Sequence, residues 1–489
     1  MRAWTLAAFG LIAAACGQQA GTLQTAANTL KAADIKTIEY SGTGKWYQFG
    51  QAPNPTLPWP PFDVSAYTAS IDYRAPAARI QMTRKQVVEP DRVRPAPVEQ
   101  KVEQYVNGTA AWNMAPPAGA PAGTAPAPQA QPAAVEERTM EIWSTPHGFL
   151  KAALANASSG SQTDGAGSTV TVMVGKNKYV GTINAQNHVE KIQTWIDNPV
   201  LGDTLVETTF SDYRDFNGVQ FPGRIVRTQG GHPVLELNVS SVRANGTVDA
   251  TVPEVARNAT VPAVQTTAEK LAEGVWYIKG GSHHSVAIAQ RDHIVVVEAP
   301  LNEARSLAVI AKVKETIPNK PIKYLVNTHV HFDHSGGLRT YVDEGATIVT
   351  HAMNRPYYEE AWRAPHTLNP DRLEQSKKSP AFETFSDKHV LTDGKRTIEV
   401  HAIQNSGHND AFAMVYLPAE KILVEVDAYA PPAAGAPPPS APNPFSVNLY
   451  ENIQRLKLDV QQIAALHGPR VATLADLRSA VGQNARTTN

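Results

Sequence analysis

The stretch most clearly suited to chemistry is the run His329-Val330-His331-Phe332-Asp333-His334-Ser335-Gly336-Gly337. Three imidazoles and one carboxylate, the borderline ligands that Zn²⁺ accepts, are gathered over six residues. A lone pair of histidines in a short window is usually a surface or core feature, but the complete His-x-His-x-Asp-His pattern is typical of a metal site. We therefore interpret these residues as metal ligands.

The elements around this motif must hold it on a loop. The apolar run Ile322–Val326, bounded by Pro321, predicts a buried strand, and the two glycines predict a tight turn into the next element. Side chains alternate along a strand, so His329 and His331 leave its end on the same face while Asp333 and His334 swing to a second position. This geometry suits two neighbouring metal ions.

Three later residues stand at comparable strand exits. His408 follows a predicted strand at 397–403, Asp427 ends a predicted strand at 421–426, and His467 closes an apolar element before Gly468. A binuclear site needs roughly three ligands per ion and a shared one, and these residues can complete it. Six other histidines match no ligand position and are interpreted as structural or surface residues, with the first two as possible pocket lining: His283, His284, His351, His366, His389 and His401.

The motifs HVHFDHSGG, SGH, VEVDA and LHGP occur in the order and approximate spacing of the metallo-β-lactamase superfamily, which residues 270–480 resemble. The resemblance implies two Zn²⁺ ions, with Fe or Mn as alternatives. It implies one ion held by His329, His331 and His408, and a second held by Asp333, His334 and His467. Asp427 would bridge the two ions.

Asp427 bears on the substrate. Zinc β-lactamases of the best-known kind carry cysteine at this position and another group carries serine, whereas a bridging aspartate resembles glyoxalase-II-like thioesterases, lactonases and phosphodiesterases. The segment HNDAFAMVYLPAEKIL nevertheless also resembles the cysteine-bearing β-lactamases. We expect a hydrolase that uses a metal-bridging hydroxide on an ester, lactone, thioester or amide, with Asp333 as the catalytic residue that orients it. A β-lactamase, a phosphodiesterase and a non-catalytic envelope-binding lipoprotein are the alternatives.

Composition narrows the partners. The 489 residues, 42% hydrophobic and 18% charged, are an ordinary globular mix for two or three domains. The 44 basic and 45 acidic residues give a net charge of -1 without a long run of either sign, which disfavours nucleic acid as a partner. A small-molecule substrate is expected. A redox diiron enzyme is disfavoured because it would carry a carboxylate at His331 and a flavin partner domain.

The N-terminus predicts export. After Met1-Arg2, an apolar stretch at 3–15 has the length of a signal peptide and is too short to span a bilayer. It ends in Ala13-Ala14-Ala15-Cys16, which resembles a bacterial lipobox and implies lipidation of Cys16, the only cysteine. An ordinary signal peptide cleaved near Ala15 is the alternative. We expect a periplasmic protein that reaches the membrane only through this anchor.

The remaining chain predicts an α+β protein. Residues 17–30 are small and polar and are expected to be a tether, and residues 31–262 predict an antiparallel β-rich accessory domain with one helix at 146–157. Its Pro/Ala-rich segment 114–134 predicts a disordered loop. Residues 213–225 faintly resemble the half-barrel of outer-membrane lipoprotein carriers.

Residues 270–489 are expected to form the catalytic domain, an αββα sandwich of the metallo-β-lactamase kind with an amphipathic helix at 303–317. Two segments are expected to wall the substrate pocket. They are the Pro-rich run 430–444 and the aromatic stretch 354–380, which together suggest a partly apolar substrate of modest size.

Overall fold

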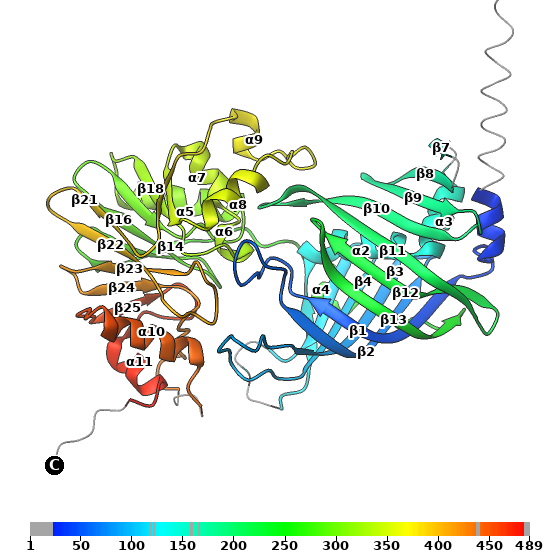
Figure 1. Ribbon diagram of the computed structural model, residues 1–489, viewed down its shortest axis with the longest axis horizontal. Helices are drawn as coiled ribbons and strands as arrows, with labels where there is room; N and C mark the ends of the chain where they lie inside the picture. The colour runs from blue at the N-terminus through cyan, green and yellow to red at the C-terminus, as the bar shows by residue number, and fades with distance from the viewer. Residues whose placement is uncertain are drawn as a thin grey trace, which may run out of the picture.

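The computed structural model describes residues 23–117, 120, 123–156, 160–164, 167–436 and 441–483. Figure 1 shows two parts side by side, a large curved sheet built by the N-terminal half and a layered helix-and-sheet domain built by the C-terminal half. The α+β class and the order of a β-rich domain followed by a sandwich are confirmed. Among the described helices, none combines the length and apolar character needed to cross a membrane.

The N-terminal sheet has 13 strands in the order β6-β5-β4-β3-β2-β1-β13-β12-β11-β10-β9-β8-β7, and all described pairs are antiparallel. The strands are β1 Thr37–Tyr47, β2 Pro61–Asp72, β3 Ala77–Gln86, β4 Gln100–Asn107, β5 Ala110–Ala115, β6 Ala127–Ala130, β7 Gly160–Asp164, β8 Gly167–Val174, β9 Asn177–Asn184, β10 Val189–Asn198, β11 Gly202–Phe216, β12 Val219–Gln229 and β13 His232–Ala244. Its short helices are η1 Pro132–Ala134, α2 Val135–Trp143, α3 Pro146–Ala155 and α4 Glu254–Arg257.

Strict alternation explains why these residues form one sheet with one covered face. In β11 every second residue from Gly202 to Phe210 is buried, as the period of two requires. The buried face packs against α2, which contacts β3 and β4, and α3, which contacts β8 and β10. Phe149 of α3 lies directly over Gly181 of β9, where a Cβ would meet the ring at 2.2 Å.

Two parts of this domain differ from the sequence predictions. Residues 23–29, expected within a tether at 17–30, form a helix, because Leu23, Ala26, Ala27 and Leu30 recur at helical spacing and are buried in the core. Residues 127–130, expected within a disordered loop at 114–134, form β6 at the sheet edge. An edge strand pairs on one side only, so it tolerates Pro128, which has no backbone N–H to donate. Residues 17–22, the predicted signal peptide and Cys16 lie outside the described residues.

The C-terminal domain stacks two sheets between helices. One sheet has the order β14-β15-β16-β17-β18-β19-β20 and the other β21-β22-β23-β24-β25-β26. The strands are β14 Thr267–Ala272, β15 Val275–Lys279, β16 Ser285–Ala289, β17 Ile294–Val297, β18 Ile322–Val326, β19 Thr347–His351, β20 Phe382–Phe385, β21 Lys388–Thr392, β22 Thr397–Ala402, β23 Ala413–Leu417, β24 Ile422–Glu425, β25 Gln462–Ala465 and β26 Ala472–Thr473. The helices are α5 Glu303–Thr316, α6 Phe332–Ser335, α7 Leu338–Glu344, α8 Asn354–Ala361, α9 Arg372–Ser376, α10 Pro444–Arg455 and α11 Leu474–Ala480.

The run Ile294–Val297 illustrates how the sandwich is held together. All four residues are fully buried, with Val295 and Val297 in the core between the sheets and Ile294 and Val296 in the core under α5 and α7. A strand covered on both faces reads as a continuous apolar run, which is why this segment shows no alternation. The predicted strand at Ile322–Val326 and the predicted helix at 303–317 are confirmed as β18 and α5.

Candidate metal centre

The predicted ligands all lie just past the carboxyl ends of strands, Asp333 and His334 in the short helix α6 and the others on loops. The motif 329–334 follows β18, His408 follows β22, Asp427 follows β24 and His467 follows β25. Most residues of these strands are buried in the sandwich, while the segments that follow them present polar groups. The sandwich therefore brings residues that are far apart in sequence to one edge.

The first cluster contains His329, His331, His408 and Asp427, whose ligand atoms all lie within 4.8 Å of one another. His329 Nε2 lies 3.3 Å from His408 Nε2. Asp427 Oδ2 lies 3.2 Å from His329 Nε2 and 2.9 Å from His408 Nε2. His331 Nδ1 is buried and has no hydrogen-bond partner among the described residues.

The second cluster contains His283, Asp333, His334 and His467, again within 4.8 Å. His334 Nε2 lies 3.2 Å from His467 Nε2, and Asp333 Oδ2 lies 3.3 Å from His283 Nε2. Asp427 reaches this cluster too, with Oδ2 3.2 Å from His334 Nε2 and Oδ1 3.1 Å from His467 Nε2. One carboxylate thus stands between both clusters.

These distances fit metal coordination. Two ligand atoms bound about 2.0–2.1 Å from one tetrahedral ion stand roughly 3.3–3.4 Å apart, and the facing histidine nitrogens stand at 3.2 and 3.3 Å. Where both facing Nε2 atoms are unprotonated, a shared cation relieves the repulsion between them. The orphaned His331 Nδ1 also points to a cation. Within the described residues, imidazoles and carboxylates here form two groups able to hold an ion.

Electrostatics keep the ligands in their binding forms. Burial lowers the pKa of both His329 and His467 to about 4, so both rings are neutral near pH 7. Burial raises the pKa of Asp427, but His334 and His408 outweigh it and hold the pKa well below its usual range. Metal ligands must be neutral imidazoles and ionised carboxylates, and these shifts favour those states.

Burial alone would lower the pKa of His334, but Asp427 and Glu298 raise it well above its usual value. A cation bound beside the ring replaces the proton that these carboxylates favour. Asp333 stays ionised, because the hydrogen bond from His283 and the charge on His334 outweigh the effect of burial on its pKa.

Three supporting residues were not identified from the sequence. The Glu298 carboxylate accepts a hydrogen bond from His334 Nδ1 at 2.8 Å, which leaves Nε2 free to bind an ion. Thr328 Oγ1 lies 3.0 Å from His329 Nδ1 and fixes that ring in the same way. Asn327 Nδ2 donates to the carbonyl of His329 at 2.8 Å and holds the turn of the motif. A carboxylate directly after the apolar run Ile294–Val297 was the available signal for Glu298.

His283 was predicted to be structural or surface, with pocket lining as the alternative, yet it joins the second cluster. It pairs with His467 through an isolated backbone bridge between the two sheets, and the ring centroids lie 4.0 Å apart. His284 Nε2 instead lies 2.9 Å from the Gly468 carbonyl oxygen, which is a structural role. Pairing across the domain placed His283 here, and such pairing leaves no local pattern.

A cleft of about 320 Å³ opens beside His331 and His408. Its other walls come from the N-terminal domain and from Phe445, and the polar lining residues are Gln48, Gln51, Gln86, Arg94 and Gln100. The start of the predicted wall at 430–444 borders the site, since Pro431 packs against Gly468 beside His467.

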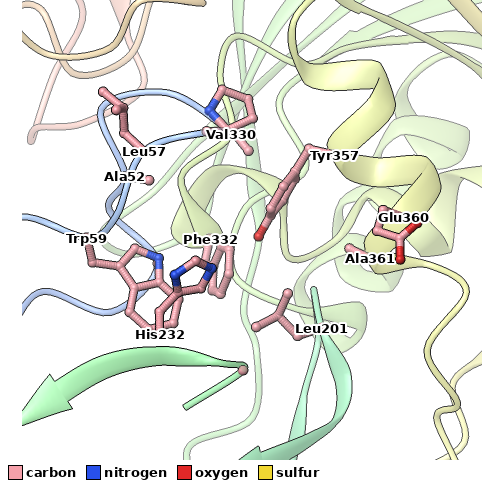
Figure 2. A pocket seen from close by; sticks show the side chains of 13 residues that line it. Ala52, Leu57, Trp59, Leu201, His232, Val330, Phe332, Tyr357, Glu360 and Ala361 are labelled. Carbon is pink, nitrogen blue, oxygen red and sulfur yellow. The ribbon is translucent and has the colours of Figure 1, made fainter. Parts of the chain in front are cut away.

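The predicted wall at 354–380 does not line this cleft. Tyr357 instead lines a separate cavity of about 150 Å³ together with Phe332, Val330 and Trp59 (Figure 2). Val330 and Phe332, which stand between the ligand residues in the sequence, thus line a cavity separate from the cleft beside His331 and His408. Tyr358 is fully buried and donates to Asn327 Oδ1 at 2.7 Å.

The model of the metallo-beta-lactamase superfamily matches residues 278–424. This range contains the motif 329–334 and His408 and ends before Asp427 and His467. No curated protein matches the sequence significantly.

Several solved structures are similar to this chain. A metallo-beta-lactamase from Pontibacter korlensis is 19% identical, with a TM-score of 0.34, and the match covers 45% of this chain and 98% of that one. FIM-1 from Pseudomonas aeruginosa, in its mono-zinc form, is 19% identical over 45% of this chain and 96% of that one, with a TM-score of 0.33. Rubredoxin oxygen:oxidoreductase from Desulfovibrio gigas is 15% identical, with a TM-score of 0.36, and the match covers 44% of this chain and 60% of that one.

The sandwich of two sheets, the ligands at its edge and the family match agree. Residues 278–424 match the metallo-beta-lactamase superfamily, and the two-sheet sandwich that they help to build carries the predicted ligands at its edge.

Proposed function

We propose that this protein is a binuclear metal-dependent hydrolase of small carbonyl compounds, that is, of an ester, lactone, thioester or amide bond. The observation that carries the proposal is the position of Asp427. Its carboxylate lies 2.9–3.2 Å from ring nitrogens of His329, His334, His408 and His467. A carboxylate in this position has two oxygens and can bind both ions at once. A cysteine thiolate that binds one ion as a terminal ligand does not.

Two ions bound here would lower the pKa of a shared water to near 7 and polarise the carbonyl oxygen of a substrate. The chain supplies the remaining chemistry. Asp333 Oδ2 faces His283 and His334, so this carboxylate can orient the attacking water and accept its proton. The same carboxylate can return that proton to the leaving group.

The imidazoles would serve as metal ligands whose rings are held in one orientation. Glu298 and Thr328 hold the Nδ1 sides of His334 and His329, so both rings present Nε2 to the site in one orientation. The cleft beside His331 and His408 has room for a molecule of modest size. Its one arginine, Arg94, is occupied by a two-pronged ion pair with Glu89, which argues against a phosphodiester.

The test is metal analysis combined with a substrate screen on purified protein. We expect about two ions per chain and turnover of at least one ester, lactone, thioester or amide. The screen includes β-lactam and phosphodiester substrates, and preferential turnover of either would replace the proposed substrate class. His331→Ala combined with His408→Ala is expected to abolish activity while the N-terminal sheet stays folded. Full metal occupancy in this double variant would contradict the ligand assignment.

Export and lipidation are proposed on the sequence of residues 1–16 alone. If Cys16 carries the anchor, Cys16→Ser should release the protein from membranes into the soluble fraction. Retention of the Cys16→Ser variant on membranes would contradict the anchor.

A further inference from the structure

We propose that the N-terminal domain is part of the catalytic centre, because its loop at residues 48–60, between β1 and β2, positions two metal ligands. In this loop Gln51 and the Ala52 carbonyl are positioning groups for Asp333 and His331. The inference rests on the proposed function and extends it to a domain for which the sequence suggested only an accessory role.

Gln51 fixes the orientation of Asp333. Its Nε2 donates to Asp333 Oδ1 at 2.8 Å, while Oδ2 of the same carboxylate faces His283 at 3.3 Å. A carboxylate held by one oxygen cannot rotate, so the other oxygen stays directed at the ligand cluster. A hydrogen bond to a ligating carboxylate is the kind of outer contact that tunes metal affinity.

Ala52 sets the proton position on His331. Its carbonyl oxygen lies 3.0 Å from His331 Nε2. A carbonyl can only accept, so Nε2 must carry the ring proton and Nδ1 must be bare. The bare Nδ1 is the buried atom that has no hydrogen-bond partner among the described residues, and His331 belongs to the first ligand cluster, so Nδ1 is the atom available to an ion. The same carbonyl accepts from Asn409 Nδ2 at 3.0 Å, which ties in the loop that carries His408.

Further bonds fasten the loop to both ligand-bearing segments. The Gly50 carbonyl accepts from the Phe332 amide at 3.1 Å, and the Pro53 carbonyl accepts from the Asp410 amide at 2.8 Å. Asn54 Nδ2 donates to Asp410 Oδ2 at 2.7 Å, and Arg92 forms a two-pronged ion pair with the same carboxylate. The loop thus bridges residues 329–334 and residues 408–410.

Aromatic packing holds the opposite side of the loop (Figure 2). The ring centroids of Phe332 and Phe49 lie 5.2 Å apart in an edge-on contact, and those of Phe49 and Trp59 lie 4.5 Å apart. The ring centroid of Trp59 lies 5.1 Å from that of His232 of β13. Gly50 has φ +75°, and a Cβ there would lie 2.6 Å from the Phe332 ring. With hydrogen bonds on one side and rings on the other, the loop is a fixed part of the site.

The same domain supplies the polar wall of the cleft. Gln48, Gln86 and Gln100 line it opposite His331 and His408. Neutral amides offer both donors and acceptors, so they suit a substrate that carries further carbonyl or amide groups beside the scissile bond. Substitution of these residues should therefore act on KM, whereas substitution of Gln51 should act on metal affinity and kcat.

The experiment compares Gln51→Ala with Gln48→Ala in the full-length protein. Zinc affinity is measured by competition with a chromophoric chelator, and kcat and KM are measured on the best substrate from the screen. We expect Gln51→Ala to weaken binding of one ion about 10- to 100-fold and to lower kcat. Gln48 lies on the same loop but none of its described side-chain atoms bonds to a ligand, so Gln48→Ala should keep the wild-type zinc affinity.

Gln51→Glu provides a second variant of the same length. It places a carboxylate against Asp333, so it should weaken zinc binding at least as much as the alanine. Wild-type zinc affinity and kcat in both Gln51 variants would overturn the positioning role. If no substrate is turned over by the wild type, the proposed function fails, while the zinc titration still decides whether Gln51 positions a ligand.

Discussion

Glu298 and His334 are joined carboxylate to Nδ1 at 2.8 Å, and both are almost completely buried. The other oxygen of Glu298 accepts from the Thr328 amide at 2.7 Å. Glu298 therefore connects the end of β17 to both the start and the end of the ligand motif. Its backbone has φ +73°, in the left-handed region that is unfavourable for residues other than glycine. The hydrogen bonds to His334 and Thr328 help to offset that cost.

Glu298→Gln should weaken zinc binding at His334 about 10- to 100-fold, because the amide removes the negative charge that orients the ring. The amide also has one acceptor oxygen for two donors, so its NH2 group must face either the Thr328 N–H or the His334 Nδ1–H. Chelator competition measures the effect. Glu399→Gln is the matched control, since Glu399 bonds to His401 at 2.8 Å away from both clusters, and it should leave zinc affinity unchanged. Equal affinities in the two variants would contradict the role of Glu298.

Asp427→Asn should reduce turnover at least about 100-fold, since an amide cannot share two anionic oxygens between two ions. Asp427→Cys should not restore the original activity, because one thiolate cannot replace a carboxylate bridge. Turnover and metal content of both variants are the measurements. Near-wild-type turnover in Asp427→Asn would show that this carboxylate does not bridge.

Gly50→Ala should destabilise the protein by about 2–4 kcal/mol, as a left-handed backbone and a ring clash both oppose the methyl group. It should also lower zinc affinity, because Phe332 lies between two ligands. Gly218→Ala is the control, with φ +89° and open space around its Cβ, so it carries only the backbone cost. Thermal unfolding and zinc titration separate the two effects, and identical behaviour of the two variants would refute the contact.

Asp203 provides a pH-dependent contact between the two domains. Burial raises the pKa of Asp203, but hydrogen bonds from the Thr367 hydroxyl and from the amides of Leu368 and Thr367 outweigh burial and lower the pKa below its usual value. A group with a lowered folded pKa stabilises above its ordinary pKa of 3.8 and loses this contribution as pH falls through the folded value.

Asp203→Ala should therefore cost about 1–2 kcal/mol at pH 7, and this cost should shrink as the pH falls below the ordinary pKa of 3.8 and through the lower folded value. Unfolding in urea at several pH values tests this. Zinc affinity at pH 7 should match the wild type, because Asp203 lies away from the ligand clusters. A stability difference that is independent of pH would contradict the assigned contact.

The ligand motif could be predicted because its residues are consecutive and follow a short apolar run. His408, Asp427 and His467 could be added only through a resemblance, since each alone is an ordinary loop residue. His283 and Gln51 could not be predicted. Gln51 and Asp333 are 282 positions apart, and their contact depends on how two domains dock. Runs rich in Thr, Val, Ile and Tyr predicted an antiparallel β-rich first domain, but not β6, whose composition favours a loop and whose pairing with β5 overrides it.

The place of β1 in its sheet has a consequence for folding order. β1 pairs with β2 on one side and with β13 on the other, and β13 is the last strand of the sheet in sequence. The strands that support loop 48–60 are therefore complete only after β1 has paired with β13, a contact between residues far apart in sequence that forms slowly. The ligand motif is translated later still. We expect zinc uptake during refolding to follow closure of the N-terminal sheet, so a chain arrested before β13 pairs would hold its histidines near one another yet bind the ions weakly.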